Sequence, residues 1–203
     1  MKTLHRNDLF SWTTFDTARN IDFHGTYWSG QGGVLIDPLP LSDHDRAHVE
    51  SLGGARTVVV TNSDHARAAL ELSKAFGATL CGPSAEREAL GWVDARWVGD
   101  GDAVVPGLTA LALDGSKTPG ELALVLEDTT LITGDLVRGQ FGGRLNRLPD
   151  EKLGDVAAAG LSIQRLAGLP SIEAVIVGDG WPIFTRGHEA LAALCASSTS
   201  AGQ

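Results

Sequence analysis

The sequence predicts an α/β protein in which two sheets are covered by helices on their outer faces. Strand-rich segments alternate with single helices in each half of the chain, which fits two sheets better than one parallel sheet. A chain of 203 residues, of which 43% are hydrophobic and 20% charged, can bury a core and suits one large domain. Because no repeat, low-complexity segment or linker divides the sequence, we expect residues 1–203 to form a single domain.

The first half of the sequence alternates extended and helical segments. Apolar runs bounded by glycine, proline and aspartate indicate strands. A capping residue before an amphipathic pattern indicates a helix. In order, the predicted segments are two strands within residues 20–38, a helix capped by Ser42 within residues 42–54, a strand over Thr57–Thr61, a helix ending near Phe76, a strand over residues 78–82, and a helix that begins at Pro83-Ser84.

The second half begins with strands only and ends with two helices. Residues 96–113 and 121–135 have strand patterns, and Glu127-Asp128 lies where a hairpin turn belongs. The remaining segments are a loop rich in glycine and arginine over residues 136–150, a long amphipathic helix from about Asp150 to Leu169, a strand over residues 173–180, and a helix that contains residues 188–194.

Charge and composition exclude several classes of partner. A net charge of −9 argues against binding to nucleic acid or to anionic membranes. The amino terminus has no apolar run long enough for a signal peptide, and no stretch approaches the length of a membrane span. Cys81 and Cys195 lie far apart and form no Cys-x-x-Cys motif, so we expect buried reduced thiols. We therefore expect a cytoplasmic protein with a small-molecule ligand and no nucleic-acid or membrane partner.

Residues 57–72, TVVVTNSDHARAALEL, place a polar loop between a strand and a helix. The carboxyl end of a strand is where α/β proteins often gather functional side chains. The loop contains Asn62, Asp64, His65 and Arg67, and we predict a functional site there.

Four segments, in order and spacing, resemble the metallo-β-lactamase superfamily. They are VLIDP, the loop just described, GSKTPGELALVLEDTTLITGD and VIVGDGWP, and the resemblance runs from about Asn20 onward. It implies a four-layer αββα sandwich. It also implies, for most members, one or two metal ions at one edge of the sheets, where a bound hydroxide attacks an ester, amide, thioester or phosphoester.

Most of the metal ligands implied by this resemblance are replaced. The family loop reads Thr-His-x-His-x-Asp-His, and we align its threonine with Thr61. Of the seven family ligands only the bridging aspartate, Asp135, is retained. The replaced positions are Asn62, Asp64, Ala66, Arg67, Lys117 and Asp179.

A second register deserves comparison. Sliding the motif back by two residues places Asp64 and His65 on the family's Asp-His pair. It also places Val60 and Asn62 at the first two ligand positions and moves the loop into the apolar strand, so we prefer the first register. In either register we expect His65 to make local hydrogen bonds rather than to ligate a metal.

Lys117 and Arg67 argue against a metal cofactor. An ammonium has no lone pair to donate and its charge repels a cation, whereas an arginine stays charged. The remaining oxygen-rich set would suit magnesium, manganese or calcium better than zinc. We therefore predict no metal and no other cofactor, and we expect Lys117 to lie roughly where a metal would and to pair with Asp64, Asp135 and Asp179.

The candidate residues fall into two groups. If catalysis remains, Lys117 could act as a general base or electrostatic clamp while Asp64 or His65 moves a proton beside Asp135 and Asp179. The ligand-binding candidates are Asn62, Arg67, Arg138 and Trp181. Arg138 shares the glycine-rich loop with Arg144 and Arg147, and a solvated loop is the simpler interpretation of all three.

Three functions remain open. The preferred one is a metal-free member of the fold that binds a small, anionic molecule at the former metal site. The first alternative is a metal-dependent hydrolase with an atypical oxygen-rich site around Asp64, Asp135 and Asp179. The second alternative is a non-catalytic structural or subunit-interaction protein, for which a homodimer is the simplest form.

Overall fold

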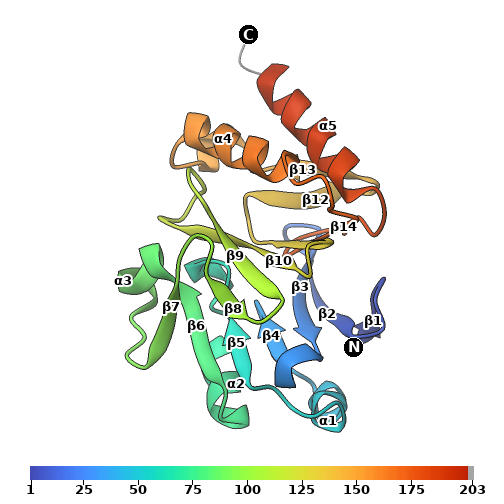
Figure 1. The fold of residues 1–203 in the computed structure, drawn as a ribbon, viewed down its shortest axis with the longest axis vertical. Helices are drawn as coiled ribbons and strands as arrows, with labels where there is room; N and C mark the ends of the chain where they lie inside the picture. Colours follow the sequence, from blue (N-terminus) through green and yellow to red (C-terminus); the bar gives the residue numbers. More distant parts are fainter. Residues whose placement is uncertain (201–203) are drawn as a thin grey trace.

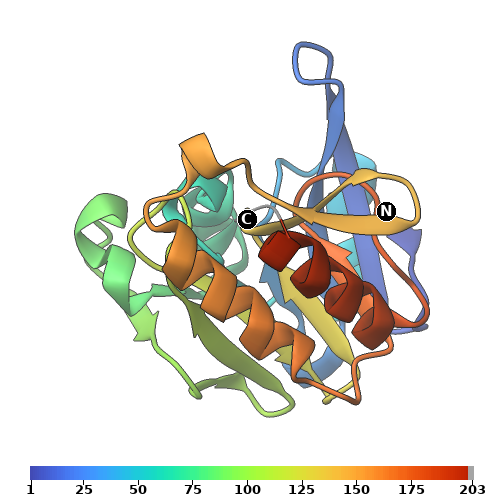
Figure 2. The same cartoon turned by 90° about the horizontal axis from the view of Figure 1, so that it is seen from above.

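The chain folds into four layers, with two β-sheets packed between two layers of helices (Figures 1 and 2). The computed structural model describes residues 1–200, with side chains as far as residue 197. Three helices flank the first sheet: α1 (Asp43–Ser51), α2 (Ala69–Phe76) and α3 (Arg87–Leu90). Two helices cover the second sheet: α4 (Val156–Ala167) and α5 (Gly187–Ser200). This arrangement confirms the predicted αββα sandwich.

The first sheet has seven strands in chain order. They are β1 (Lys2–Thr3), β2 (Leu9–Asp16), β3 (Ile21–Trp28), β4 (Val34–Ile36), β5 (Thr57–Val59), β6 (Thr79–Pro83) and β7 (Ala95–Val98). Strands β1 to β4 pair antiparallel, and β4 to β7 pair parallel. Because the parallel strands β4 and β5 run in the same direction, the residues that follow them meet at one edge of the sheet.

The second sheet has five strands in the order β14-β11-β10-β9-β8. Their bounds are β8 (Ala103–Val105), β9 (Leu108–Leu113), β10 (Glu121–Leu126), β11 (Thr130–Thr133) and β14 (Ala174–Val177). Only β11 and β14 pair parallel among these strands. The carboxyl ends of β11 and β14 therefore lie together, which brings two aspartate-bearing loops side by side.

Three apolar clusters hold the four layers together. One lies between the sheets and includes Trp28 and Leu124. The second packs the five-stranded sheet against α4 and α5, with Ile163 and Leu191 fully buried. The third packs the first sheet against α1 and α2 and includes Leu72. No helix within residues 1–200 is long and apolar enough to cross a membrane.

Most predicted segments are confirmed. The Ser42 hydroxyl caps α1 by accepting a hydrogen bond from the backbone N–H of Asp45, at 3.1 Å. The β10–β11 turn falls at Glu127 and Asp128, both with positive φ, 46° and 60°. Positive φ at both central positions is what a tight hairpin turn requires.

The predicted glycine-rich loop at residues 136–150 is wrong in part. Strands β12 (Val137–Phe141) and β13 (Arg144–Arg147) form a hairpin across Gly142-Gly143. Glycine and arginine weaken the strand signal in the sequence. The hairpin is fixed by tertiary pairing: Gly139 donates to Asp179 O at 3.0 Å and accepts from Trp181 N at 2.7 Å.

Two other predictions differ from the structure. Strand β2 was not predicted, because its first four residues are buried and the next three exposed, so it has no period-two alternation. It nevertheless pairs with β3 along its whole length. Helix α4 begins at Val156 rather than near Asp150, because Asp155 caps it through the backbone N–H of Ala158 at 3.0 Å.

Candidate functional site

Loops from both sheets meet at one edge of the sandwich and form the candidate site. The first sheet contributes Asp37, directly after β4, and residues 61–67 after β5. The second sheet contributes residues 114–120 between β9 and β10, residues 134–138 after β11, and residues 178–181 after β14. Strand β3 adjoins the last of these, because the backbone N–H of His24 donates to Gly178 O at 2.8 Å.

Asp37 holds the loop that follows β5. Its carboxylate is 3% exposed and accepts hydrogen bonds from the Thr61 backbone N–H and hydroxyl, both at 2.6 Å. The same carboxylate lies 2.7 Å from His65 Nδ1. The sequence alone did not indicate this role, because an aspartate followed by proline at the end of an apolar run indicates only that the strand ends there. Its position after an apolar strand, in a positive-φ turn of 45°, could have drawn attention to it.

His65 is buried and points between two carboxylates. Its backbone N–H donates to Asn62 Oδ1 at 3.0 Å, which is a local hydrogen bond of the predicted kind. Its ring bonds instead to a residue distant in the chain, because Nδ1 lies 2.7 Å from Asp37. Its Nε2 lies 3.7 Å from Asp135 Oδ2. Burial disfavours the protonated ring, but the Asp37 and Asp135 charges prevail and raise the pKa of His65. The imidazole therefore lies between two carboxylates that favour its protonated form.

Glu86 ties the two site loops of different sheets together. It is fully buried and accepts hydrogen bonds from the backbone N–H groups of Ser63 at 2.6 Å and Gly120 at 3.2 Å. The sequence did not indicate this role for Glu86, because a glutamate in a short helical segment is expected to face solvent.

Glu121 fixes the loop that carries Asp135. Its carboxyl group is fully buried and accepts from the Leu136 backbone N–H at 2.9 and 3.1 Å and from the Ser116 hydroxyl at 2.6 Å. Burial, helped by the nearby Asp135 charge, raises the pKa of Glu121 to about 7. The hydrophobic pattern of the strand did not indicate this role for Glu121. A charged residue in an otherwise apolar strand could nevertheless have indicated a buried functional carboxyl group.

Asp135 and Asp179 form the acidic centre of the site, and Arg138 bridges them. The Arg138 Nη2 atom contacts both carboxylates: it lies 3.0 Å from Asp135 Oδ1 and 2.6 Å from Asp179 Oδ2. Arg67 Nη2 lies 3.4 Å from Asp179 Oδ1. Burial opposes ionisation of Asp135, but His65 and Lys117 outweigh it and lower its pKa. Burial raises the pKa of Asp179 despite its arginine partners.

Lys117 closes the site from the loop between β9 and β10. Its Nζ lies 2.7 Å from Asp64 Oδ2 and 3.1 Å from Asp135 Oδ2, and its side chain is 30% exposed. Partial burial disfavours the ammonium, but its bonds to Asp64 and Asp135 raise the pKa of Lys117. The expected pairing with Asp64 and Asp135 is present. The expected pairing with Asp179 is wrong, because Arg138 and Arg67 contact the two oxygens of that carboxylate.

The other candidates separate into near and distant residues. Asn62 is buried and donates from Nδ2 to Asp135 Oδ2 at 3.2 Å. Arg138 is only 14% exposed, so the solvated-loop interpretation is wrong for it. Trp181 is 61% exposed and does not line the site cleft. Its backbone pairs with Gly139, which directs the segment after Asp179 away from the centre.

Three of these side chains could hold a metal ion. Ligand atoms of His65, Asp135 and Asp179 lie within 4.8 Å of one another, and all three residues are buried. However, every carboxylate oxygen of Asp135 and Asp179 already contacts a basic side chain. A cation could enter only by displacing these contacts and taking the proton from His65.

The site opens into a cleft of about 830 Å³, a volume typical of small-molecule pockets. Its acidic lining consists of Asp64, Asp135 and Asp179. Its basic lining, apart from His65, consists of Arg19, Arg67, Lys117, Arg138 and Lys152. The cleft therefore carries an excess of positive charge in a protein whose net charge is −9.

Comparisons with known proteins agree on the fold. A family model described as metallo-beta-lactamase superfamily matches residues 1–198, which extends the resemblance to the amino terminus. No curated protein sequence is similar enough to count as a match.

Several solved structures resemble the chain over nearly its whole length. The DIM-1 metallo-beta-lactamase has 15% identity and a TM-score of 0.74, with 98% of this chain and 96% of that chain covered. A metallo-beta-lactamase from Pontibacter korlensis has 18% identity and a TM-score of 0.73, with 96% of each chain covered. A metallo-beta-lactamase family protein from Thermus thermophilus has 16% identity and a TM-score of 0.67, with 96% of this chain and 80% of that chain covered. Identities this low show the fold alone.

Replacing Asp37 by asparagine should destabilise the protein by about 3–5 kcal/mol. The substitution removes the carboxylate nearest to the buried His65 ring and turns an amide N–H toward the hydrogen-bond donors of Thr61. Urea unfolding at neutral pH measures the loss. The matched control is Asp94→Asn on the exposed turn before β7, which should change stability by less than about 0.5 kcal/mol. A loss below about 1 kcal/mol for Asp37→Asn would show that the pair is not a structural ion pair.

The raised pKa of Glu121 predicts a pH-dependent stability. The folded group keeps its proton up to about pH 7, whereas the unfolded group titrates near 4.5. Its contribution is therefore complete below pH 4.5 and is lost as the pH rises through 7. Relative to Glu121→Gln, the wild type should lose about 2–3 kcal/mol of unfolding free energy between about pH 5 and about pH 8.

Urea unfolding of both proteins at a series of pH values measures this difference. The exposed residue Glu151 provides the control, since Glu151→Gln should follow the wild type at every pH. Parallel curves for the wild type and Glu121→Gln would mean that Glu121 titrates as an ordinary carboxyl group.

Proposed function

The chain belongs to the metallo-beta-lactamase superfamily, and we propose that it is a metal-free member that binds a small anionic molecule at the former metal site. The observation that carries this proposal is that the protein's own basic side chains form ion pairs with the two buried aspartates of the site. Asp135 and Asp179 are paired by Lys117, Arg67 and Arg138 at 2.6–3.4 Å. These side chains supply the positive charge that a metal ion would otherwise supply.

The charges of the cluster support a metal-free state. Four carboxylates, those of Asp37, Asp64, Asp135 and Asp179, face four basic groups, those of His65, Lys117, Arg67 and Arg138. A divalent ion would add two charges to a balanced cluster and repel the three fixed cations. Removing one charged side chain from such a buried cluster destabilises the fold, because its partner is left unpaired. In the complete cluster each charge has an opposite charge beside it.

The donors that remain free favour an anionic ligand. Lys117 has three ammonium donors and contacts two carboxylates, so one donor remains for a ligand. Arg138 uses only Nη2 in its ion pairs. Lys152 lines the cleft, is exposed, and forms no ion pair within the described residues. These groups can bind a carboxylate or phosphate without breaking the internal pairs.

The protein's own residues then have distinct tasks. Arg138, Lys117 and Lys152 bind the anion and orient it. Asp37 keeps His65 protonated and in place, and proton transfer is the chemistry that His65, Lys117 or Asp64 could still perform. Apolar side chains complete the wall and exclude water from one side of the ligand; they are Ile21, Phe23, Leu39, Leu148 and Pro149.

The second candidate is a metal-dependent hydrolase, and the close approach of His65, Asp135 and Asp179 favours it. Two carboxylates and one imidazole form a mixed donor set that a hard cation would accept. In that case Arg138 and Lys117 would have to withdraw from the carboxylates, so metal binding would be accompanied by loss of their ion pairs.

Metal analysis separates the two candidates. Untagged protein, purified without chelator and then incubated with zinc, manganese or magnesium and dialysed, should contain far less than stoichiometric metal by mass spectrometry, because the cluster is already neutralised. Lys117→Met and Arg138→Met, made singly and together, remove fixed cations and serve as the comparison. Near-stoichiometric metal in the wild type would refute the metal-free proposal and favour the hydrolase.

Anion binding tests the ligand class. The wild type should bind butanoate or inorganic phosphate in isothermal titration calorimetry, and Lys152→Gln should lower the affinity by about threefold to tenfold, the loss expected from one solvent-facing charge. Lys74→Gln on α2, an exposed lysine outside the cleft, is the matched control and should leave the affinity unchanged. Absence of binding for every anion, or equal effects of both substitutions, would contradict the anion-binding proposal.

A further inference from the structure

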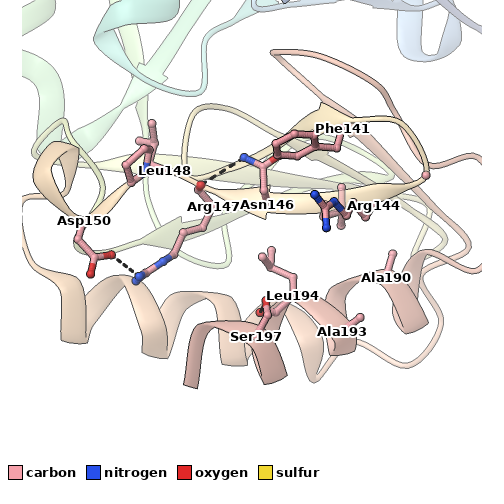
Figure 3. Close-up of a pocket in the computed structure, with 13 residues that line it drawn as sticks. Phe141, Arg144, Asn146, Arg147, Leu148, Asp150, Ala190, Ala193, Leu194 and Ser197 are labelled. Carbon is pink, nitrogen blue, oxygen red and sulfur yellow. Dashed lines mark hydrogen bonds and ion pairs between the residues drawn. The ribbon is translucent and has the colours of Figure 1, made fainter. Parts of the chain in front are cut away.

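A second cleft, of about 500 Å³, lies between the β12–β13 hairpin and α5 (Figure 3). One wall is the exposed side of α5, where Ala190, Ala193 and Ser197 face the hairpin. Small side chains on this helix face leave the space open. None of the site residues described above, apart from Leu148 and Pro149, lines it.

The floor of this cleft is apolar. Leu145, Leu148 and Leu194 line it and are 6%, 1% and 4% exposed. At one end the Arg144 guanidinium stacks on the Phe141 ring, 4.4 Å from its centroid. Because stacked arginine presents an apolar edge together with a charge, this end can border an aliphatic chain and still face water.

The polar groups of the cleft are mostly engaged elsewhere. Arg147 pairs with Asp150, and Asn146 Nδ2 donates to Arg147 O at 3.3 Å (Figure 3). Asn146 Oδ1 also accepts from the Gln140 backbone N–H at 2.8 Å. The Ser197 hydroxyl donates to Leu194 O at 2.8 Å. A ligand in this cleft would thus meet few free hydrogen-bonding groups and would be held by apolar contact.

The two clefts share a wall. Leu148 and Pro149 line both of them, and Pro149 is exposed, so the two clefts adjoin at these residues. The adjacent residues Gln140 and Phe141 line one cleft each. We call the cleft at the candidate site the basic cleft and the one between the β12–β13 hairpin and α5 the apolar cleft. A flexible chain that leaves the basic cleft over Pro149 therefore enters the apolar cleft directly.

We propose that the ligand is an amphipathic anion whose charged head lies at Lys117, Arg138 and Lys152 and whose aliphatic chain crosses Pro149 into the cleft between β12–β13 and α5. This inference rests on the proposed anion binding and adds the chemical class of the ligand. The basic side chains of the first cleft would bind the anionic head. The aliphatic chain would fill the apolar cleft, which a short polar anion would leave empty.

The test is the dependence of affinity on chain length. Butanoate, hexanoate, octanoate and decanoate, each below its micelle concentration, are titrated into the wild-type protein by calorimetry. Each methylene buried in the cleft should raise the affinity by about threefold to fourfold until the cleft is filled. Affinity that does not change from butanoate to decanoate would overturn the inference.

A substitution that fills the cleft supplies the second readout. Ala193→Phe should weaken decanoate binding at least about tenfold and leave butanoate binding unchanged, because only the chain uses the cleft. Ala192→Phe is the matched control: it makes the same change at the neighbouring exposed position of α5, which does not line the cleft, and should alter neither affinity. If Ala193→Phe fails to fold, Ser197→Phe, at an exposed position of the same wall, replaces it.

The outcomes distinguish this inference from the proposed function. Chain-length dependence that Ala193→Phe abolishes supports the extended ligand. Binding of all four alkanoates with equal sensitivity to both phenylalanine substitutions, or with none, overturns the extended ligand and leaves anion binding in place. Failure of every alkanoate and of inorganic phosphate to bind overturns both.

Discussion

The structure depends on the pairing of carboxylates buried at the shared edge of the two sheets. Asp135 and Asp179 are 2% and 3% exposed, and an unpaired charge at that depth would cost several kcal/mol. Each therefore requires a cation at fixed distance, which determines where Arg138, Lys117 and Arg67 lie. Lys117 and Arg67 come from two loops and Arg138 comes from strand β12, so the pairing fixes the relative positions of these segments and, through them, the shape of the cleft.

A second group of buried carboxylates supports the first. Asp37, Glu86 and Glu121 each accept backbone N–H donors from the loops around the site. Glu86 joins the loop after β5 to the loop before β10, which belong to different sheets. Loop backbone at such depth has few other partners, so these side chains replace the hydrogen bonds that a sheet or helix would supply. The site and the packing of the two sheets are consequently one structural unit.

Charge is distributed unevenly between the protein and its cleft. The chain carries −9 overall, yet the cleft presents more basic than acidic side chains. Most of these charges are paired, including Arg19 with Asp16, whereas Lys152 lines the cleft without an ion pair within the described residues. A cleft of opposite sign to the rest of the surface attracts ligands that the remainder of the protein repels. This difference would direct an anion to one place on the molecule, and the apolar cleft beyond Pro149 would then select among anions by their chains.

The sequence by itself determined the layered fold and most of the strands and helices, since these follow from local hydrophobic periods, caps and turns such as Ser42 and Glu127-Asp128. It also led to the prediction that Lys117 pairs with Asp64 and Asp135, which the structure confirms. Only the tertiary structure decided that Arg138 bridges Asp135 and Asp179, that Asp37, Glu86 and Glu121 are buried supports, and that Trp181 lies outside the cleft. These are contacts between residues distant in the chain, and local patterns treat each such charged residue as solvent-exposed. The β12–β13 hairpin was missed for the same reason, because pairing with the segment after Asp179 stabilises a sequence whose own strand preference is weak.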